Sequence, residues 1–66
     1  MRFIKLTEIY RTDEFVNIYL NVDEIEGFSK EKTDDYTMLS TKCSRVFEFK
    51  ETPEEIIELI KNAKEI

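Results

Sequence analysis

The chain has 66 residues, a formal net charge of −5, one cysteine and no histidine. A chain of this length supports a single hydrophobic core, so we expect residues 1–66 to form one domain. A lone cysteine cannot form an internal disulfide, the usual Cys/His zinc ligands are missing, and the negative charge repels a phosphate backbone.

Residues 2–10 predict the first strand. Their sequence, RFIKLTEIY, is rich in β-favouring residues and lacks the helical spacing of apolar positions. Alternation places Ile4, Leu6 and Tyr10 on one face and Phe3, Thr7 and Ile9 on the other. Both faces of this strand are therefore partly apolar.

Residues 15–22 carry the clearest strand pattern in the chain, after a turn expected at 11–14. Their sequence, FVNIYLNV, alternates without interruption. The inward set is Val16, Ile18, Leu20 and Val22, and the outward set is Phe15, Asn17, Tyr19 and Asn21.

Three shorter strands are expected at residues 25–30, 36–41 and 45–50. Gly27, in the first of them, indicates a bulge or a close approach of another backbone. The connections at 31–35 and around 42–44 lack the Asn-Gly or Asp-Gly pair of a tight hairpin, so we expect looser loops there.

The segment KETPEEIIELIKNAK, at residues 50–64, predicts a helix over about 53–65. Thr52 precedes Pro53 and lies three residues before Glu55, which is the pattern of a capping box with proline at the first helical position. At 100° per residue the apolar positions form one stripe: Ile56, Leu59, Ile60, Ala63 and Ile66, with Ile57 at its margin. We expect this stripe to cover one face of the sheet.

Together these elements predict an α+β fold that is mostly β: an antiparallel meander of four or five strands within residues 2–50, capped by one C-terminal helix. A single helix covers only one face of a sheet, which leaves Phe3, Ile9, Phe15 and Tyr19 on the other. Two interpretations stay open. Either the sheet curls into a small barrel that encloses these residues, or they form a contact surface, for example in a homo-oligomer.

No residue pattern predicts catalysis. Adjacent carboxylates, as at residues 34–35 and 54–55, point apart into water and do not face one another across a cleft. Cys43 has no histidine to activate it, and the chain has no phosphate-binding loop, EF-hand loop or cofactor motif. We therefore expect a non-enzymatic protein without catalytic, cofactor or metal-binding residues.

An alternative function uses four basic residues near the loop ends: Lys30, Lys32, Lys42 and Arg45. They could form a local basic patch of a nucleic-acid-associated regulator, with Phe28 and Tyr36 close by for base stacking. The overall negative charge argues against nucleic-acid binding.

The chain also lacks the pattern of a membrane protein. No stretch approaches the roughly 20 apolar residues of a membrane span. Residues 1–5 lead into alternation and not into the apolar core of a signal peptide. We expect no membrane insertion and a cytoplasmic location.

Three short segments carry a family resemblance: IKLT at 4–7, YLNVDEIE at 19–26 and FKETPEEIIELI at 49–60. With them the chain resembles, over most of its length, the small FlbD/SwrD-type flagellar proteins and related short phage and prophage proteins. The matching positions are Leu20, Asn21, Asp23, Ile25, Glu26, Lys50, Glu51, Glu54 and Glu55. The resemblance implies an accessory role at the flagellar motor, without enzymatic activity and without catalytic residues to carry over.

A phage or mobile-element relative with the same scaffold and another partner fits equally well. The sequence therefore predicts a small interaction or accessory module, either flagellar-motor-associated or encoded by a phage or mobile element, and leaves its protein partner unidentified.

Overall fold

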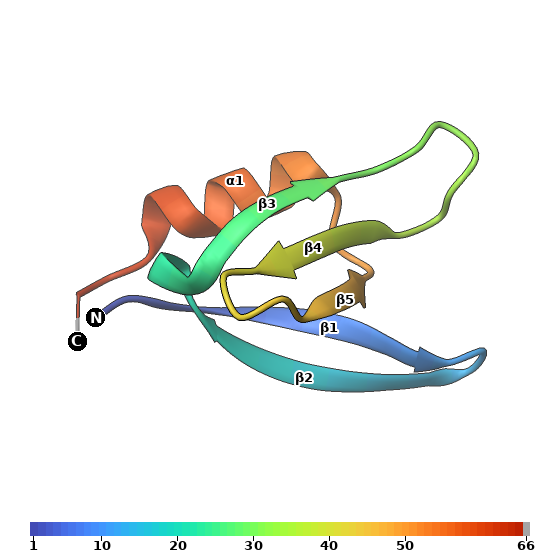
Figure 1. Cartoon of the computed structure of the whole chain (residues 1–66), viewed down its shortest axis with the longest axis horizontal. Coiled ribbons are helices and arrows are strands. Elements are labelled where there is room, and N and C mark those ends of the chain that lie inside the picture. The colour runs from blue at the N-terminus through green and yellow to red at the C-terminus, as the bar shows by residue number, and fades with distance from the viewer. Residues whose placement is uncertain (66) are drawn as a thin grey trace.

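The fold is a curled antiparallel sheet with one helix against it (Figure 1). The computed structural model describes residues 1–65. In chain order the elements are β1 (Phe3–Arg11), β2 (Glu14–Asn21), the short 3-10 helix η1 (Val22–Glu24), β3 (Ile25–Ser29), β4 (Thr37–Thr41), β5 (Val46–Phe49) and α1 (Pro53–Asn62). The predicted mostly-β meander with one C-terminal helix is confirmed, with five strands.

The strand order in the sheet is β2-β1-β5-β4-β3. The β1–β2 hairpin and the β3–β4–β5 meander meet where Glu8 pairs with Phe49. The two edge strands, β2 and β3, are consecutive in the chain and are joined by η1 alone. Five strands laid flat would hold these edges roughly 19 Å apart. A three-residue 3-10 turn rises only about 2 Å per residue, so the sheet must curl strongly.

The curl does not close the sheet into a barrel. Among the strands of residues 1–65, β2 pairs only with β1, and β3 only with β4. The barrel interpretation is therefore wrong, and Phe15 and Tyr19 are 51% and 68% exposed. Both residues lie on the convex face of the curled sheet, because the concave face is already filled by the core and α1.

The core lies between the concave face of the sheet and α1. Its fully buried apolar residues are Ile4, Leu6, Leu39, Phe49 and Ile56. Side chains from three strands and the helix meet in this cluster, so the β1–β2 hairpin and the β3–β4–β5 meander share one core.

Helix α1 begins as predicted. The Glu55 N–H donates to Thr52 Oγ1 at 3.2 Å, and the Thr52 N–H donates to Glu55 Oε1 at 3.0 Å, which completes the capping box. The helix ends at Asn62, earlier than the expected residue 65, because Ala63 is extended and Glu65 then bridges to Arg2 at the start of β1.

The apolar stripe of α1 packs on the core as predicted. Ile56 is fully buried, and Leu59, Ile60 and Ala63 are partly buried against the cluster. Ile57, at the margin of the stripe, is exposed. Ile66 lies outside the described residues.

Two residues predicted to face inward are exposed: Tyr10 and Val16. Both lie near the tip of the β1–β2 hairpin, which extends past the rest of the sheet (Figure 1). Tyr10 lies in a register shift between Ile9 and Arg11, so strict alternation does not hold there. Val16 lies opposite Glu8, the one β1 residue that pairs with β5 within the described residues.

Two local expectations have different outcomes. Of the two alternatives predicted for Gly27, the structure has the irregularity: a register shift lies between Ile25 and Gly27, whereas a Cβ at Gly27 would meet nothing within 4 Å. The connection at 42–44 is a tight turn and not a loose loop. Thr41 N–H donates to the Arg45 carbonyl at 2.9 Å, and Ser44 takes a left-handed conformation with φ 68°.

Candidate interaction surface

The outer face is defined here as the face of the sheet that points away from α1. In the β1–β2 pair, Ile9 lies opposite Phe15, and Lys5 lies opposite Tyr19. Residues opposite one another in an antiparallel pair project from the same side. Ile4 and Leu6 alternate with them and point into the core. The four predicted residues Phe3, Ile9, Phe15 and Tyr19, called the outer patch, therefore share the outer face.

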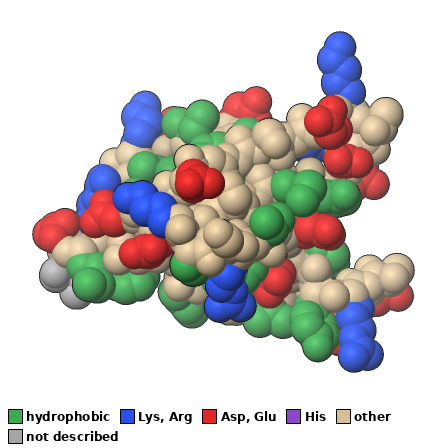
Figure 2. All heavy atoms as spheres, viewed as in Figure 1, with side chains coloured by type: hydrophobic (Ala, Val, Ile, Leu, Met, Phe, Trp, Pro, Cys, Tyr) green, Lys and Arg blue, Asp and Glu red, His purple; other side chains and the backbone are tan. Residues whose placement is uncertain are grey.

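The outer patch consists of two groups. Ile9 and Phe15 face each other near the hairpin tip, and Phe3 lies diagonally from Tyr19 at the other end of the strands. The residues between the groups are polar: Thr7 and Asn17. The three aromatic rings are exposed and Ile9 is half-buried. Figure 2 shows hydrophobic side chains at the surface along the lower rim, where Figure 1 places β2.

Lys50 lies beside the aromatic ring at the hairpin tip. Its Nζ is 4.5 Å from the centroid of the Phe15 ring, and its backbone N–H donates to the Thr7 carbonyl at 2.9 Å. A cation–π contact at an exposed site contributes about 0.5–1 kcal/mol. The contact therefore restricts the ring, which still remains half exposed.

Sequence reasoning missed a second exposed apolar group on the outer face. Met38 and Val46 are exposed there and border a shallow hollow of about 300 Å³ between β3, β4 and β5. Strict alternation in the last two strands could have found them, because Met38 precedes the buried Leu39, and Val46 precedes the partly buried Phe47.

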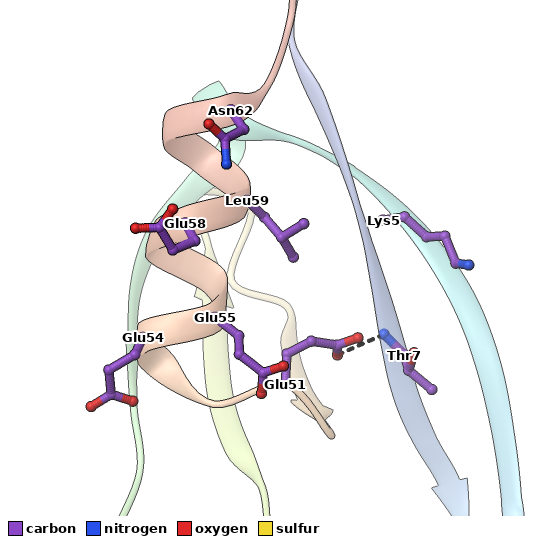
Figure 3. Close-up of a pocket in the computed structure, with 8 residues that line it drawn as sticks. All are labelled: Lys5, Thr7, Glu51, Glu54, Glu55, Glu58, Leu59 and Asn62. Carbon is purple, nitrogen blue, oxygen red and sulfur yellow. Dashed lines mark hydrogen bonds between the residues drawn. The ribbon is translucent and has the colours of Figure 1, made fainter.

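A larger groove of about 630 Å³ runs between α1 and β1, lined by four glutamates, two β1 residues, and Leu59 and Asn62 of α1 (Figure 3). Glu51 spans it. Its Oε1 accepts the Thr7 N–H at 2.9 Å, and its carbonyl accepts the Thr37 hydroxyl at 2.6 Å. Glu51 thus occupies part of the β1 edge that no strand covers, and we assign the groove no ligand.

The structure separates the four candidate basic residues into two pairs. Lys30 and Lys32 lie in the loop before β4, whereas Lys42 and Arg45 lie in the turn after it. A strand of this length spans roughly 17 Å. The two pairs therefore lie at opposite ends of β4 and do not form one patch.

Tyr36, the proposed stacking residue near the first pair, has acidic neighbours. The Asp34 carboxylate, and after it that of Glu48, raise the pKa of Tyr36 above its ordinary value of 10.0. This end of the sheet is therefore negative around the ring, which disfavours an approaching phosphate.

The remaining candidate groups are isolated. Cys43 is exposed in the β4–β5 turn, with Sγ 3.3 Å from Thr41 Oγ1. Within residues 1–65, no group of three or more acidic or cysteine side chains is placed to hold a metal ion. No helix of the same range is long and apolar enough to cross a membrane.

Comparisons with protein-family models, with curated proteins and with solved structures gave no match. Function must therefore be inferred from the surfaces of the chain itself.

Proposed function

We propose that this protein is a non-enzymatic protein–protein interaction module that contacts its partner through the outer patch. The observation that carries the proposal is the exposure of three aromatic rings, those of Phe3, Phe15 and Tyr19, on one sheet face. Large aromatic residues gathered on one face mark contact surfaces, and tyrosine is enriched among residues that dominate binding energy.

The surroundings of the patch support the same proposal. Lys5 and Lys50 lie on this face although the chain carries a net charge of −5. A partner that offers apolar side chains with a few carboxylates would complement it.

The cellular context remains a proposal based on resemblance. A FlbD/SwrD-type accessory role at the flagellar motor, or a related role encoded by a phage or mobile element, is compatible with an interaction surface on a small scaffold. We propose a cytoplasmic location, in which a single cysteine would stay reduced.

Nucleic-acid binding is the less favoured alternative. Two separated basic pairs and an acidic chain provide little attraction for a phosphate backbone. Micromolar binding to mixed-sequence DNA or RNA at physiological salt, falling steeply as salt is raised, would favour this alternative over the outer patch.

Site-specific photo-crosslinking tests the proposal. A benzophenone amino acid is placed at Tyr19 and, as a matched control, at Ile57, an exposed apolar residue on α1. In cells that naturally contain the protein, Tyr19 should give discrete cross-linked products that Phe15→Glu removes, and Ile57 should give few. Equal products from both positions, or none from Tyr19, would contradict the proposal. Mass spectrometry of the products would identify a motor protein, a phage protein or a second copy of this chain.

A further inference from the structure

The outer edge of β2 is an open hydrogen-bonding edge. Backbone groups of successive residues point to opposite sides of an antiparallel strand. On β1, the backbone groups of Thr7 point away from β2. Its N–H donates to the Glu51 carboxylate, and its C=O accepts the Lys50 N–H. The backbone N–H and C=O groups of the neighbouring residue Leu6 therefore point toward β2, where Leu6 is paired with Ile18. The N–H and C=O groups of Phe15, Asn17 and Tyr19 consequently point away from β1, on a side where the described sheet has no further strand.

The other strand edges are partly protected. Natural sheets shield their edges with short strands, charges, bulges or a covering group. β3, the second edge strand, has five residues, a glutamate and a register shift. The part of β1 that β5 does not reach is bonded at Thr7 by the Glu51 carboxylate.

β2 is the less protected of the two edge strands, although its pairing with β1 also carries a register shift, between Ile9 and Arg11 near the hairpin tip. It is eight residues long and contains no lysine, arginine, proline or glycine, and its one charged residue is Glu14 at its start. In a chain with 38% charged residues, the uncharged stretch from Phe15 to Asn21 is the place where another strand meets least repulsion.

The pattern of β2 is complementary to itself. Two copies can pair antiparallel about a two-fold axis at Asn17. Phe15 of each copy then lies opposite Tyr19 of the other copy. Asn17 lies opposite Asn17, and Val16 lies opposite Ile18 on the inner side. Aromatic cross-strand pairs are favourable. Each pair of residues whose backbone groups point out from the open edge exchanges two backbone hydrogen bonds. Glu14 lies opposite Leu20, so no like charges meet.

We infer that β2 accepts the β2 strand of a second copy, forming a two-fold dimer with one continuous sheet. Such an isologous contact is the commonest route to a closed dimer. It also places Ile18 of the second copy beside the exposed Val16, and Tyr19 beside the exposed Phe15. This inference rests on the proposed function, because Phe15 and Tyr19 belong to the outer patch.

Cysteine cross-linking tests the register in a Cys43→Ser background. The proposed pairing places the two Asn17 Cα atoms about 5.5 Å apart, within the range of about 4.4–6.8 Å that a disulfide spans. Asn17→Cys should give a covalent dimer on mild oxidation, or with a short thiol-to-thiol reagent.

Asn21→Cys is the matched control, because the same pairing holds the two Asn21 residues roughly 27 Å apart. We expect at least tenfold more dimer from Asn17→Cys than from Asn21→Cys at tens of micromolar. Phe15→Cys mixed with Tyr19→Cys should cross-link, while each alone should not. Equal cross-linking of all positions, or none at Asn17, would overturn the inference.

Light scattering supplies an independent readout. Asn17→Lys sets two ammonium groups against each other and should leave a folded monomer, whereas Asn21→Lys should remain a dimer. A dimer unaffected by Asn17→Lys would show packing through another surface and overturn the edge pairing. If Tyr19 cross-links to a different protein while Asn17→Cys gives no dimer, the interaction module stands and the edge inference fails. If neither cross-links, both fail.

Discussion

β1 and β2 carry similar alternating patterns in different surroundings. β1 lies between β2 and β5 with α1 against its inner side, and Ile4 and Leu6 are 4% and 0% exposed. Within residues 1–65, β2 has a neighbouring strand on one side only, and Val16 on its inner side is 42% exposed. Alternation thus determines which way a side chain points, and the place of the strand in the sheet decides whether that side chain is buried.

The backbones of the two strands differ in the same way. The Glu51 carboxylate accepts the Thr7 N–H at the open part of the β1 edge, whereas the outer edge of β2 has no strand beside it among residues 1–65. The contrast teaches that a side chain can bond a strand edge at a position where the next strand of the sheet does not reach.

The largest expected effect contrasts burial in the two strands. Leu6→Ala should lower the free energy of unfolding by about 2–5 kcal/mol, because it leaves a cavity in the core. Val16→Ala should cost about 1 kcal/mol or less, since its side chain is already partly in water. Urea unfolding in an Asn17→Lys background measures both without a contribution from the proposed dimer. Similar losses for the two variants would contradict the comparison.

The next effect concerns the β1 edge. Glu51→Ala removes the acceptor of the Thr7 N–H and should cost about 1–2 kcal/mol. In hydrogen exchange, the Thr7 amide should lose its protection, while in the monomer the Asn17 and Tyr19 amides on the open β2 edge exchange fast in either case. Glu54→Ala, at an exposed position on α1, is the control. A Thr7 amide that stays protected in Glu51→Ala would show that another group closes this edge.

A smaller effect tests how far β1 depends on the helix. Thr52→Ala breaks the capping box and should cost about 1 kcal/mol. Because α1 packs on the inner side of β1, exchange should speed up in α1 and β1 more than at the hairpin tip. Thr12→Ala, in the exposed hairpin turn, should change stability by less than about 0.5 kcal/mol. Equal losses for the two threonines would argue against a role of the cap.

The smallest effect is expected from pH. The hydrogen bond and the charge of the N-terminal ammonium group, with a lesser contribution from Arg2, lower the pKa of the Glu65 carboxyl below 4.5. Its stabilising contribution is therefore full above pH 4.5 and is lost as the pH falls through the lowered pKa. NMR should show the start of β1 loosening at low pH while the middle of β2 stays unchanged. Glu65→Gln should remove this dependence, and a variant that keeps it would assign the change to another carboxylate.

Much of the fold was predictable because its signals are local. Alternation identified β1 and β2, and the Thr52, Pro53 and Glu55 pattern identified the start of α1. The direction of the Phe15 and Tyr19 side chains followed from the same alternation. Helix ends and turns were predicted less well. The helix ends at Asn62, and Glu65 forms a β-bridge with Arg2, a contact between residues far apart in the sequence.

The amino-acid sequence alone determined the strands, the helix and the face on which each side chain lies, because these depend on backbone geometry repeated every two or 3.6 residues. Tertiary structure alone decided the strand order and the placement of Glu51 at the β1 edge. Each of these depends on which distant segments meet, as when Glu8 pairs with Phe49. That pairing makes β1 central and leaves β2 at an edge, and no local pattern in either strand contains this information.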